Sequence, residues 1–284
     1  MVINSKVILF LCGDVMTGRG IDQIHPHPNH PRINEPFVHD ARDYVSLAEK
    51  KSGEIAKPVP FSYIWGVALQ EFGRVKPDVR IINLETTITQ SEDWAARPDR
   101  PGVNFLEDLS DTSVNRVAHL VKRFKVQEHD FAIASIHWGE NWSYQITDEE
   151  ISFAHSLIDE AGIDLVHGHS SHHPKGIEVY QDCAILYGCG DFITDYEGIQ
   201  GYEEFRGDLG FMYFVTVNPS TGKLLRLEMV PTQMRRLQIN RASIQDTEWL
   251  KDLMNREGQP FGTQVVLSKD HSLLLKWKSA DNRL

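Results

Sequence analysis

Two patterns of apolar positions alternate along the first two thirds of the chain. Short runs of consecutive apolar residues, as at 7–12, are typical of strands buried on both faces. Apolar residues at helical spacing, as in 112–124, indicate amphipathic helices. Strands are expected at 7–12, 78–84, 131–136 and 163–166, and helices at 42–51, 63–73, 112–124 and 147–162. This alternation predicts a layered α/β domain.

Strands separated by turn residues follow the last of these elements. Gln181 and Asp182 are turn-type residues between two short apolar runs, and 218–222 is a second such turn, so antiparallel hairpins are predicted. Strands are expected at 177–180, 184–187, 211–217 and 223–230, then a helix at 243–257 and edge strands at 264–267 and 273–277. Because no repeat or linker divides the sequence, residues 1–284 are interpreted as one domain.

Composition narrows the class of protein. The 284 residues are 41% hydrophobic and 24% charged, as in an ordinary globular domain. The 29 basic and 40 acidic residues give a net charge of -11, which disfavours nucleic acid and anionic lipid as partners. No apolar stretch reaches the roughly 20 residues of a membrane-spanning helix. The 3 cysteines are too few for a disulfide framework, and we therefore expect a cytoplasmic protein.

Carboxylate and imidazole side chains follow successive predicted strands. Asp14 follows the first strand, Glu85 the second, His137 the third, and His169 and His172 the fourth. Ligands of open α/β sheets bind beyond the carboxyl ends of the strands. This donor set suits Zn, Mn or Fe, and two such ions can activate water and hold a phosphoryl group. The pattern therefore predicts a hydrolytic metal site.

Ordinary structural explanations compete with this hypothesis. A Gly-Asp pair after a strand, as at Asp14, is most often a turn, and His137 could equally be a half-buried histidine with a hydrogen-bond partner. The cluster of three histidines in 168–173 has no packing explanation and is the strongest part of the metal hypothesis. The histidines of the Pro-rich stretch 24–36 are better explained by a surface or substrate-lining loop, and Cys189 by a buried structural thiol.

Short motifs in a fixed order resemble the bacterial capsule-synthesis family (CapA or PgsA type, poly-gamma-glutamate). They are Gly13-Asp14-Val15-Met16 with Gly18-Arg19-Gly20, Asn83-Leu84-Glu85-Thr86-Thr87, Ser135-Ile136-His137-Trp138-Gly139, Gly168-His169-Ser170-Ser171-His172, and Leu186-Tyr187-Gly188-Cys189-Gly190-Asp191-Phe192. That family in turn is similar to the calcineurin-like metallophosphoesterases. The resemblance implies a four-layer α/β/β/α sandwich, a two-metal site and a role in making or exporting poly-gamma-glutamate.

The resemblance also implies a role for individual residues. The implied metal ligands are Asp14 as the first ligand, Glu85 as the bridging carboxylate, His137 on the second metal, and His169 and His172 as the closing pair. Arg19 is a candidate contact to substrate. His173 and Asp191 are candidate groups for proton transfer.

The chain departs from the family pattern in two respects. Family members usually carry, between the motifs at Glu85 and His137, a strand ending in Asn-Asn-His and a helix after it. Here residues 89–131 hold only one connection and one helix, so we expect one internal strand-helix unit to be absent, with the join near 97–102. We also expect the second metal position to be incomplete. The other departure is that no export signal or anchor is seen.

Three functions are compatible with the sequence. The first is a capsule-synthesis protein whose divalent metal, in a mono- or dinuclear centre, promotes hydrolysis of a phosphoester or related anionic substrate, small or polymeric. The second is a noncatalytic scaffold of a polymer-synthesis complex with a degenerate metal site. The third is a phosphoesterase unrelated to capsules. The sequence sets neither the metal nor the oligomeric state.

Overall fold

The largest sheet forms the centre of the protein. The structure is a computed structural model that describes residues 6–85, 104–125, 127 and 130–278. The sheet has 7 strands in the order β13-β14-β11-β10-β1-β3, with β12 on β11. Its strands are β1 (Val7–Leu11), β3 (Val79–Arg80), β10 (Leu209–Val217), β11 (Leu224–Met234), β12 (Ile239–Arg241), β13 (Gln264–Leu267) and β14 (Leu273–Lys276). β1 joins a parallel neighbour, β3, to an antiparallel one, β10.

Two smaller sheets carry the strand ends where a site was expected. The 4-stranded sheet has the order β5-β6-β8-β7, and the 3-stranded sheet has the order β4-β2-β9. Their strands are β5 (Ile133–His137), β6 (Leu165–His169), β7 (Ile177–Tyr180), β8 (Cys183–Leu186), β2 (Asp14–Val15), β4 (Asn83–Leu84) and β9 (Asp191–Ile193). β2 lies between β4 and β9 and is parallel to both.

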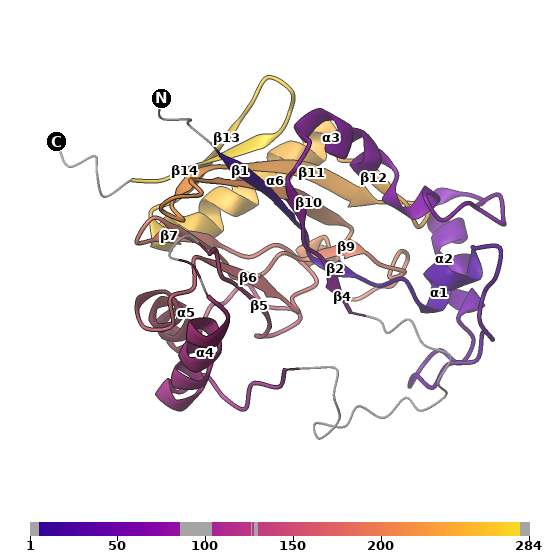
Figure 1. The fold of residues 1–284 in the computed structure, drawn as a ribbon. Coiled ribbons are helices and arrows are strands. Elements are labelled where there is room, and N and C mark those ends of the chain that lie inside the picture. The colour runs from indigo at the N-terminus through magenta and orange to yellow at the C-terminus, as the bar shows by residue number, and fades with distance from the viewer. Residues whose placement is uncertain (1–5, 86–103, 126, 128–129, 279–284) are drawn as a thin grey trace.

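Among the described residues, five helices cover the outer faces of the two larger sheets and a sixth, the last in the chain, packs into the core between the sheets (Figure 1). They are α1 (Arg19–Gln23), α2 (Arg42–Ser52), α3 (Val67–Val75), α4 (Asp111–Phe124), α5 (Asp148–Asp159) and α6 (Ile244–Gly258), with three short 3-10 turns, Tyr63–Trp65, Glu203–Phe205 and Gln259–Phe261. One buried cluster joins α1, α2 and α3 to the 7-stranded sheet, and another joins α4 and α5 to the 4-stranded sheet. A third lies between the two sheets. The order of layers is therefore α/β/β/α, as the resemblance to the capsule-synthesis family implied.

The alternation of side chains along each strand produces these separate cores. On β1, Leu9 and Leu11 belong to the core between the sheets, whereas Phe10 belongs to the core under the helices. On β6, Leu165 points to the core between the sheets and Val166 to the core under α4 and α5. A strand buried on both faces needs apolar residues at every position, which explains the continuous apolar runs in the sequence.

Local signals in the sequence account for several element boundaries. The hydroxyl of Thr147 accepts a hydrogen bond from the Glu150 amide while the Glu150 carboxylate caps the Thr147 amide, which confirms the predicted start of α5. Gln181 and Asp182 both have positive φ and connect the antiparallel pair β7 and β8, as expected for a hairpin. The predicted hairpin of β10 and β11 is confirmed as well.

The helix predicted at 63–73 is wrong in its details. The structure has a 3-10 turn at Tyr63–Trp65 and begins α3 only at Val67. Gly66 separates them with a φ of 41°, and a Cβ there would lie 2.0 Å from the carbonyl oxygen of Ile239. Apolar spacing alone does not reveal this break, because the break depends on a distant strand. The short elements α1, β9 and β12 were not predicted either.

The region between β4 and β5 bears on the expected loss of a strand-helix unit. Each of these strands lies at the end of its own sheet. In the part of the chain between them that the structure describes, α4 is the one helix and there is no strand. The expected join at 97–102 lies outside the described residues. Among the described helices, none is long and apolar enough to cross a membrane.

Candidate metal centre

Asp14 lies at the junction of three strands. It is the first residue of β2, and its Cα is in register with Asn83 of β4 and Asp191 of β9. The preceding residue must be glycine, because a Cβ on Gly13 would lie only 1.6 Å from the carbonyl oxygen of Gly190. The Asp14 amide donates to that same oxygen at 3.0 Å. This close approach holds the Asp14 carboxylate in a fully buried position.

Histidines of the 4-stranded sheet lie beside the Asp14 carboxylate. β5 and β6 are parallel, with His137 in register with His169 and Ser135 in register with His167. Residues two apart on a strand share a face, so all four side chains lie on one face of this strand pair. Gly168 is required between His167 and His169, since a Cβ there would lie 2.5 Å from the carbonyl oxygen of Tyr187.

Asp14, His137 and His169 form a compact group of donor atoms. Each offers one atom that could bind a cation, and these atoms all lie within 4.8 Å of one another. The Nδ1 atoms of His137 and His169 are 3.1 Å apart. The Nδ1 atom of His169 is 3.5 Å from Oδ1 of Asp14. Of the sequence-predicted ligands, the structure brings these three together.

A chain of hydrogen bonds sets the tautomer of His169. The backbone carbonyl of Cys12 can only accept, so His167 donates from Nε2 over 2.7 Å, and its Nδ1 accepts. Ser135 therefore donates its hydroxyl to His167 Nδ1 over 3.2 Å and accepts from His169 Nε2 over 3.1 Å. With its proton on Nε2, His169 directs the lone pair of Nδ1 toward His137 and Asp14. Such outer contacts commonly fix the orientation of metal-binding histidines.

Electrostatics at the group favour a cation. Burial, against the attraction of Asp14, lowers the pKa of His169 to about 4, so its imidazole is neutral at pH 7. Burial and the neighbouring Asp14 carboxylate raise the pKa of Glu85 to about 9. Glu85 Oε2 lies 3.9 Å from His137 Nδ1. The Asp14 and Glu85 carboxyl groups and the His169 lone pair lie close together with no positive charge between them. A divalent ion would supply that charge, so these residues fit the implied metal.

Two neighbours position Asp14. Asn83 donates from its side-chain amide to Asp14 Oδ1 over 2.6 Å. The backbone amide of Ser170 donates to Oδ2 over 3.3 Å. Ser170 has a φ of 103° and directly follows His169, the last residue of β6. The backbone at this strand end therefore places the His169 side chain and also holds the Asp14 carboxylate.

His172 and Asp191 form a separate buried pair. The Nδ1 atom of His172 donates to the two Asp191 oxygens over 3.0 and 3.2 Å, and its Nε2 lies 3.2 Å from the side-chain nitrogen of Asn141. Burial opposes a charged imidazole, but the hydrogen bond and charge of Asp191 outweigh it and raise the pKa of His172. The structure therefore places the expected fifth ligand in a pair of its own, beside the three-residue group.

The two other candidate residues are also engaged. His173 is fully buried among aromatic rings, with Tyr144 at 4.4 Å and Phe205 at 4.7 Å between centroids, and burial lowers its pKa to about 4. Arg19 donates to Asp195 over 2.6 Å and to Glu35 over 3.0 Å. In the described residues both side chains thus have packing or ion-pair roles.

Sequence reasoning missed the residues that orient the donors, namely Ser135, His167, Asn83 and Asn141. For two of them a signal existed. Ser135 and His137, and likewise His167 and His169, are separated by one residue, and that period of two marks one face of a strand. Asn83 and Asn141 act across elements, and no local pattern marks such contacts.

Known proteins resemble the chain over most of its length. The sequence model of the family described as "Bacterial capsule synthesis protein PGA_cap" matches residues 8–98 and 90–196. A probable polyglutamine synthesis accessory protein of Mycobacterium tuberculosis is 36% identical over 363 aligned positions, which cover 94% of this chain and 95% of the relative. The PGA biosynthesis protein CapA of Bacillus subtilis is 28% identical over 153 positions, covering 54% of this chain and 36% of the relative.

The form of these matches agrees with an absent internal unit. The alignment to the M. tuberculosis protein has 363 positions, more than the 284 residues of this chain, so the relative has residues without a counterpart here. The family model matches in two segments that meet at 90–98, next to the expected join. With a family match over more than half of its length, the chain belongs to the bacterial capsule synthesis protein family.

Proposed function

We propose that this protein serves capsule or polyglutamate synthesis by hydrolysing a phosphoester or a related anionic substrate with one divalent cation, Mn, Zn or Fe, held by Asp14, His137 and His169. The observation that carries the proposal is the convergence of two imidazole Nδ1 atoms, 3.1 Å apart, on a buried carboxylate. A bound divalent ion would polarise an oxygen of the substrate and activate water.

The residues of the chain would contribute in distinct ways. Asn83 orients the Asp14 carboxylate, and Ser135 keeps the Nδ1 lone pair of His169 directed inward. Glu85 adds a carboxylate beside His137. Asp191 holds a proton at Nδ1 of His172, which suits the pair to proton transfer. A second ion at His172 would have to use Nε2 in place of the present contact to Asn141.

A noncatalytic scaffold is the second candidate. The expected absence of a strand-helix unit favours it, because members of the family usually take one metal ligand and a candidate general acid from that unit. The M. tuberculosis relative is itself named a probable accessory protein. In this alternative the metal site is degenerate, and the three-residue group promotes no hydrolysis.

Metal analysis combined with an activity assay tests both candidates. The purified chain is loaded with Mn²⁺, Zn²⁺ or Fe²⁺, its metal content is measured, and hydrolysis of an aryl phosphate is followed. We expect one tightly held ion and metal-dependent hydrolysis. Asp14→Asn should weaken metal binding by more than about 100-fold, beyond the range for residues that only orient a ligand.

The control is Asp43→Asn, which changes an exposed carboxylate on α2 and should leave both measurements unchanged. Metal binding without hydrolysis would contradict the hydrolase and favour the scaffold. Two tightly held ions per chain would contradict the incomplete second site. Absence of metal binding would contradict the hydrolase and agree with a scaffold whose metal site is degenerate.

A further inference from the structure

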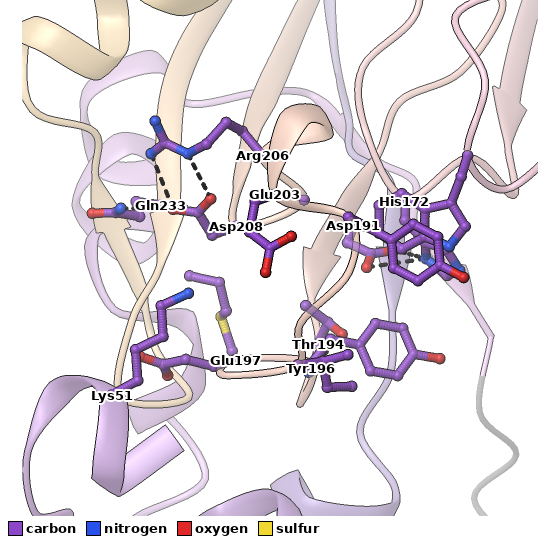
Figure 2. A pocket seen from close by; sticks show the side chains of 15 residues that line it. Lys51, His172, Asp191, Thr194, Tyr196, Glu197, Glu203, Arg206, Asp208 and Gln233 are labelled. Atoms are coloured by element: carbon purple, nitrogen blue, oxygen red, sulfur yellow. Dashed lines mark hydrogen bonds and ion pairs between the residues drawn. The ribbon is translucent and has the colours of Figure 1, made fainter. Parts of the chain in front are cut away.

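A cavity of about 530 Å³ opens beside the His172 and Asp191 pair. Its wall comes from the end of α2, the segment that follows β9, the 3-10 turn at Glu203–Phe205, and β11. Figure 2 shows charged side chains entering this space from opposite sides. The cavity adjoins the proposed metal centre through Asp191 but contains none of the three grouped ligands.

Several charges of the wall are already neutralised by partners. Arg206 donates to Asp208 over 2.9 Å and to Asp246 over 2.8 Å. Asp208 also accepts from Gln233 over 2.8 Å. Asp191 is paired with His172. These groups form closed pairs and leave little charge for a ligand.

The remaining charges are two carboxylates and one ammonium. Glu197 is buried and accepts hydrogen bonds from the Ser52 hydroxyl and, over 3.1 Å, from the Leu237 amide, but it has no ion-pair partner among the described residues. Glu203 accepts from the Gly201 amide over 3.1 Å. The Lys51 side chain makes no hydrogen bond or ion pair in the described part of the chain, and Figure 2 shows its ammonium directed into the cavity toward Glu203. Negative charge is therefore in excess.

Apolar side chains complete the wall. Ile199 is 42% exposed, Tyr202 is 45% exposed, and Met234 lies at the end of β11. Trp142 stacks on Tyr202 with 4.2 Å between ring centroids, which stiffens that part of the wall. Exposed apolar groups in a concave site favour burial of hydrocarbon.

We propose that this cavity binds a primary ammonium group carried on a short alkyl chain, with the ammonium at Glu203 and the alkyl part against Ile199, Tyr202 and Met234. The excess of carboxylates attracts a cation and opposes a phosphate or carboxylate. Among the described residues that line the cavity, Lys51 is the one lysine, and its ammonium already competes for these carboxylates. The site is independent of the proposed hydrolysis, since it needs no metal.

Binding of three matched probes tests the proposal. Pentylamine, pentanol and pentanoate share a five-carbon chain and differ in charge, and their binding to the full chain is measured by calorimetry in an amine-free buffer. Pentylamine should bind, pentanol about tenfold more weakly and pentanoate not measurably, because a hydrogen bond to a charged group contributes more than one between neutral groups.

Two substitutions sharpen the test. Glu203→Gln should weaken pentylamine about tenfold by removing the charge that pairs with the ammonium. Lys51→Met should tighten pentylamine by removing its competitor, an effect that a merely structural lysine would not produce. The matched control Glu160→Gln, on an exposed position at the end of α5, should change neither.

Other outcomes overturn the proposal. Binding of pentanoate that is lost in Lys51→Met would identify an anion site, and no binding of any probe would show that the cavity is not an amine site. His169→Ala should retain pentylamine binding. In the unaltered protein, amine binding without metal-dependent hydrolysis would contradict the proposed function alone, and metal-dependent hydrolysis without amine binding would contradict this inference alone.

Discussion

The end of β6 and the turn after it carry two histidine–carboxylate contacts that differ in kind. His169 approaches Asp14 loosely, at 3.5 Å, has its proton on the far nitrogen, and has a pKa lowered to about 4. His172 lies closer to its partner Asp191, at 3.0 Å, and has its proton on the nitrogen that faces the carboxylate. The pKa of His172 is raised. The first contact leaves two lone-pair donors without a positive charge between them. The second supplies its own proton.

The two histidines carry their protons on different nitrogens because the outer nitrogen of each imidazole has a different partner. Ser135 accepts from the outer nitrogen of His169, so the inner nitrogen cannot carry the proton. Asn141 faces the outer nitrogen of His172, and the carboxylate of Asp191 takes the proton on the inner side. The same residue types, three positions apart in the chain, thus form a candidate cation site or a closed pair, depending on one distant partner.

Removal of His169 should give the largest effect. His169→Ala takes away one of the three grouped donors, and we expect metal affinity to fall by more than about 100-fold, beyond the range for orienting residues. Calorimetric titration with Zn²⁺ or Mn²⁺ measures the affinity. His119→Ala, an exposed histidine on α4, serves as the control. Unchanged affinity in His169→Ala would show that the group does not bind the ion.

Removal of the orienting hydroxyl should give a smaller effect. Ser135→Ala breaks the contact that keeps the His169 proton outside the group, and metal affinity should fall by about 10- to 100-fold. The same titration applies, with Ser46→Ala on α2 as the matched control. An affinity equal to that of the unaltered protein would mean that Ser135 has no part in setting the tautomer.

Removal of His172 should affect metal affinity least. His172→Ala leaves the buried Asp191 carboxylate without its partner, so the free energy of unfolding in urea should fall by about 1–3 kcal/mol. Affinity for the ion should fall by less than about tenfold, because the two histidines share no hydrogen-bond partner. A loss as large as that of His169→Ala would make His172 a ligand and erase the contrast between the contacts.

Part of the structure could be predicted because its causes are local. Apolar runs gave the buried strands, Thr147 with Glu150 gave the start of α5, and the strand ends gave Asp14, His137 and His169. The roles of Ser135 and His167 were hidden because they depend on the register between β5 and β6. The ion pair of Arg19 with Asp195 could not be predicted either, because Asp195 lies 176 residues away in the chain.

The backbone carbonyl of Cys12 couples the candidate metal centre to the packing between the two sheets. It ends the hydrogen-bond chain of His169, yet it belongs to the edge of the opposite layer, directly after β1. A small shift between the two layers would therefore move His167 and rotate the His169 imidazole, which would face the proposed ion. Loosening the interlayer packing, for example by Leu165→Ala, should be detectable as an altered cation affinity even though no donor atom has been touched.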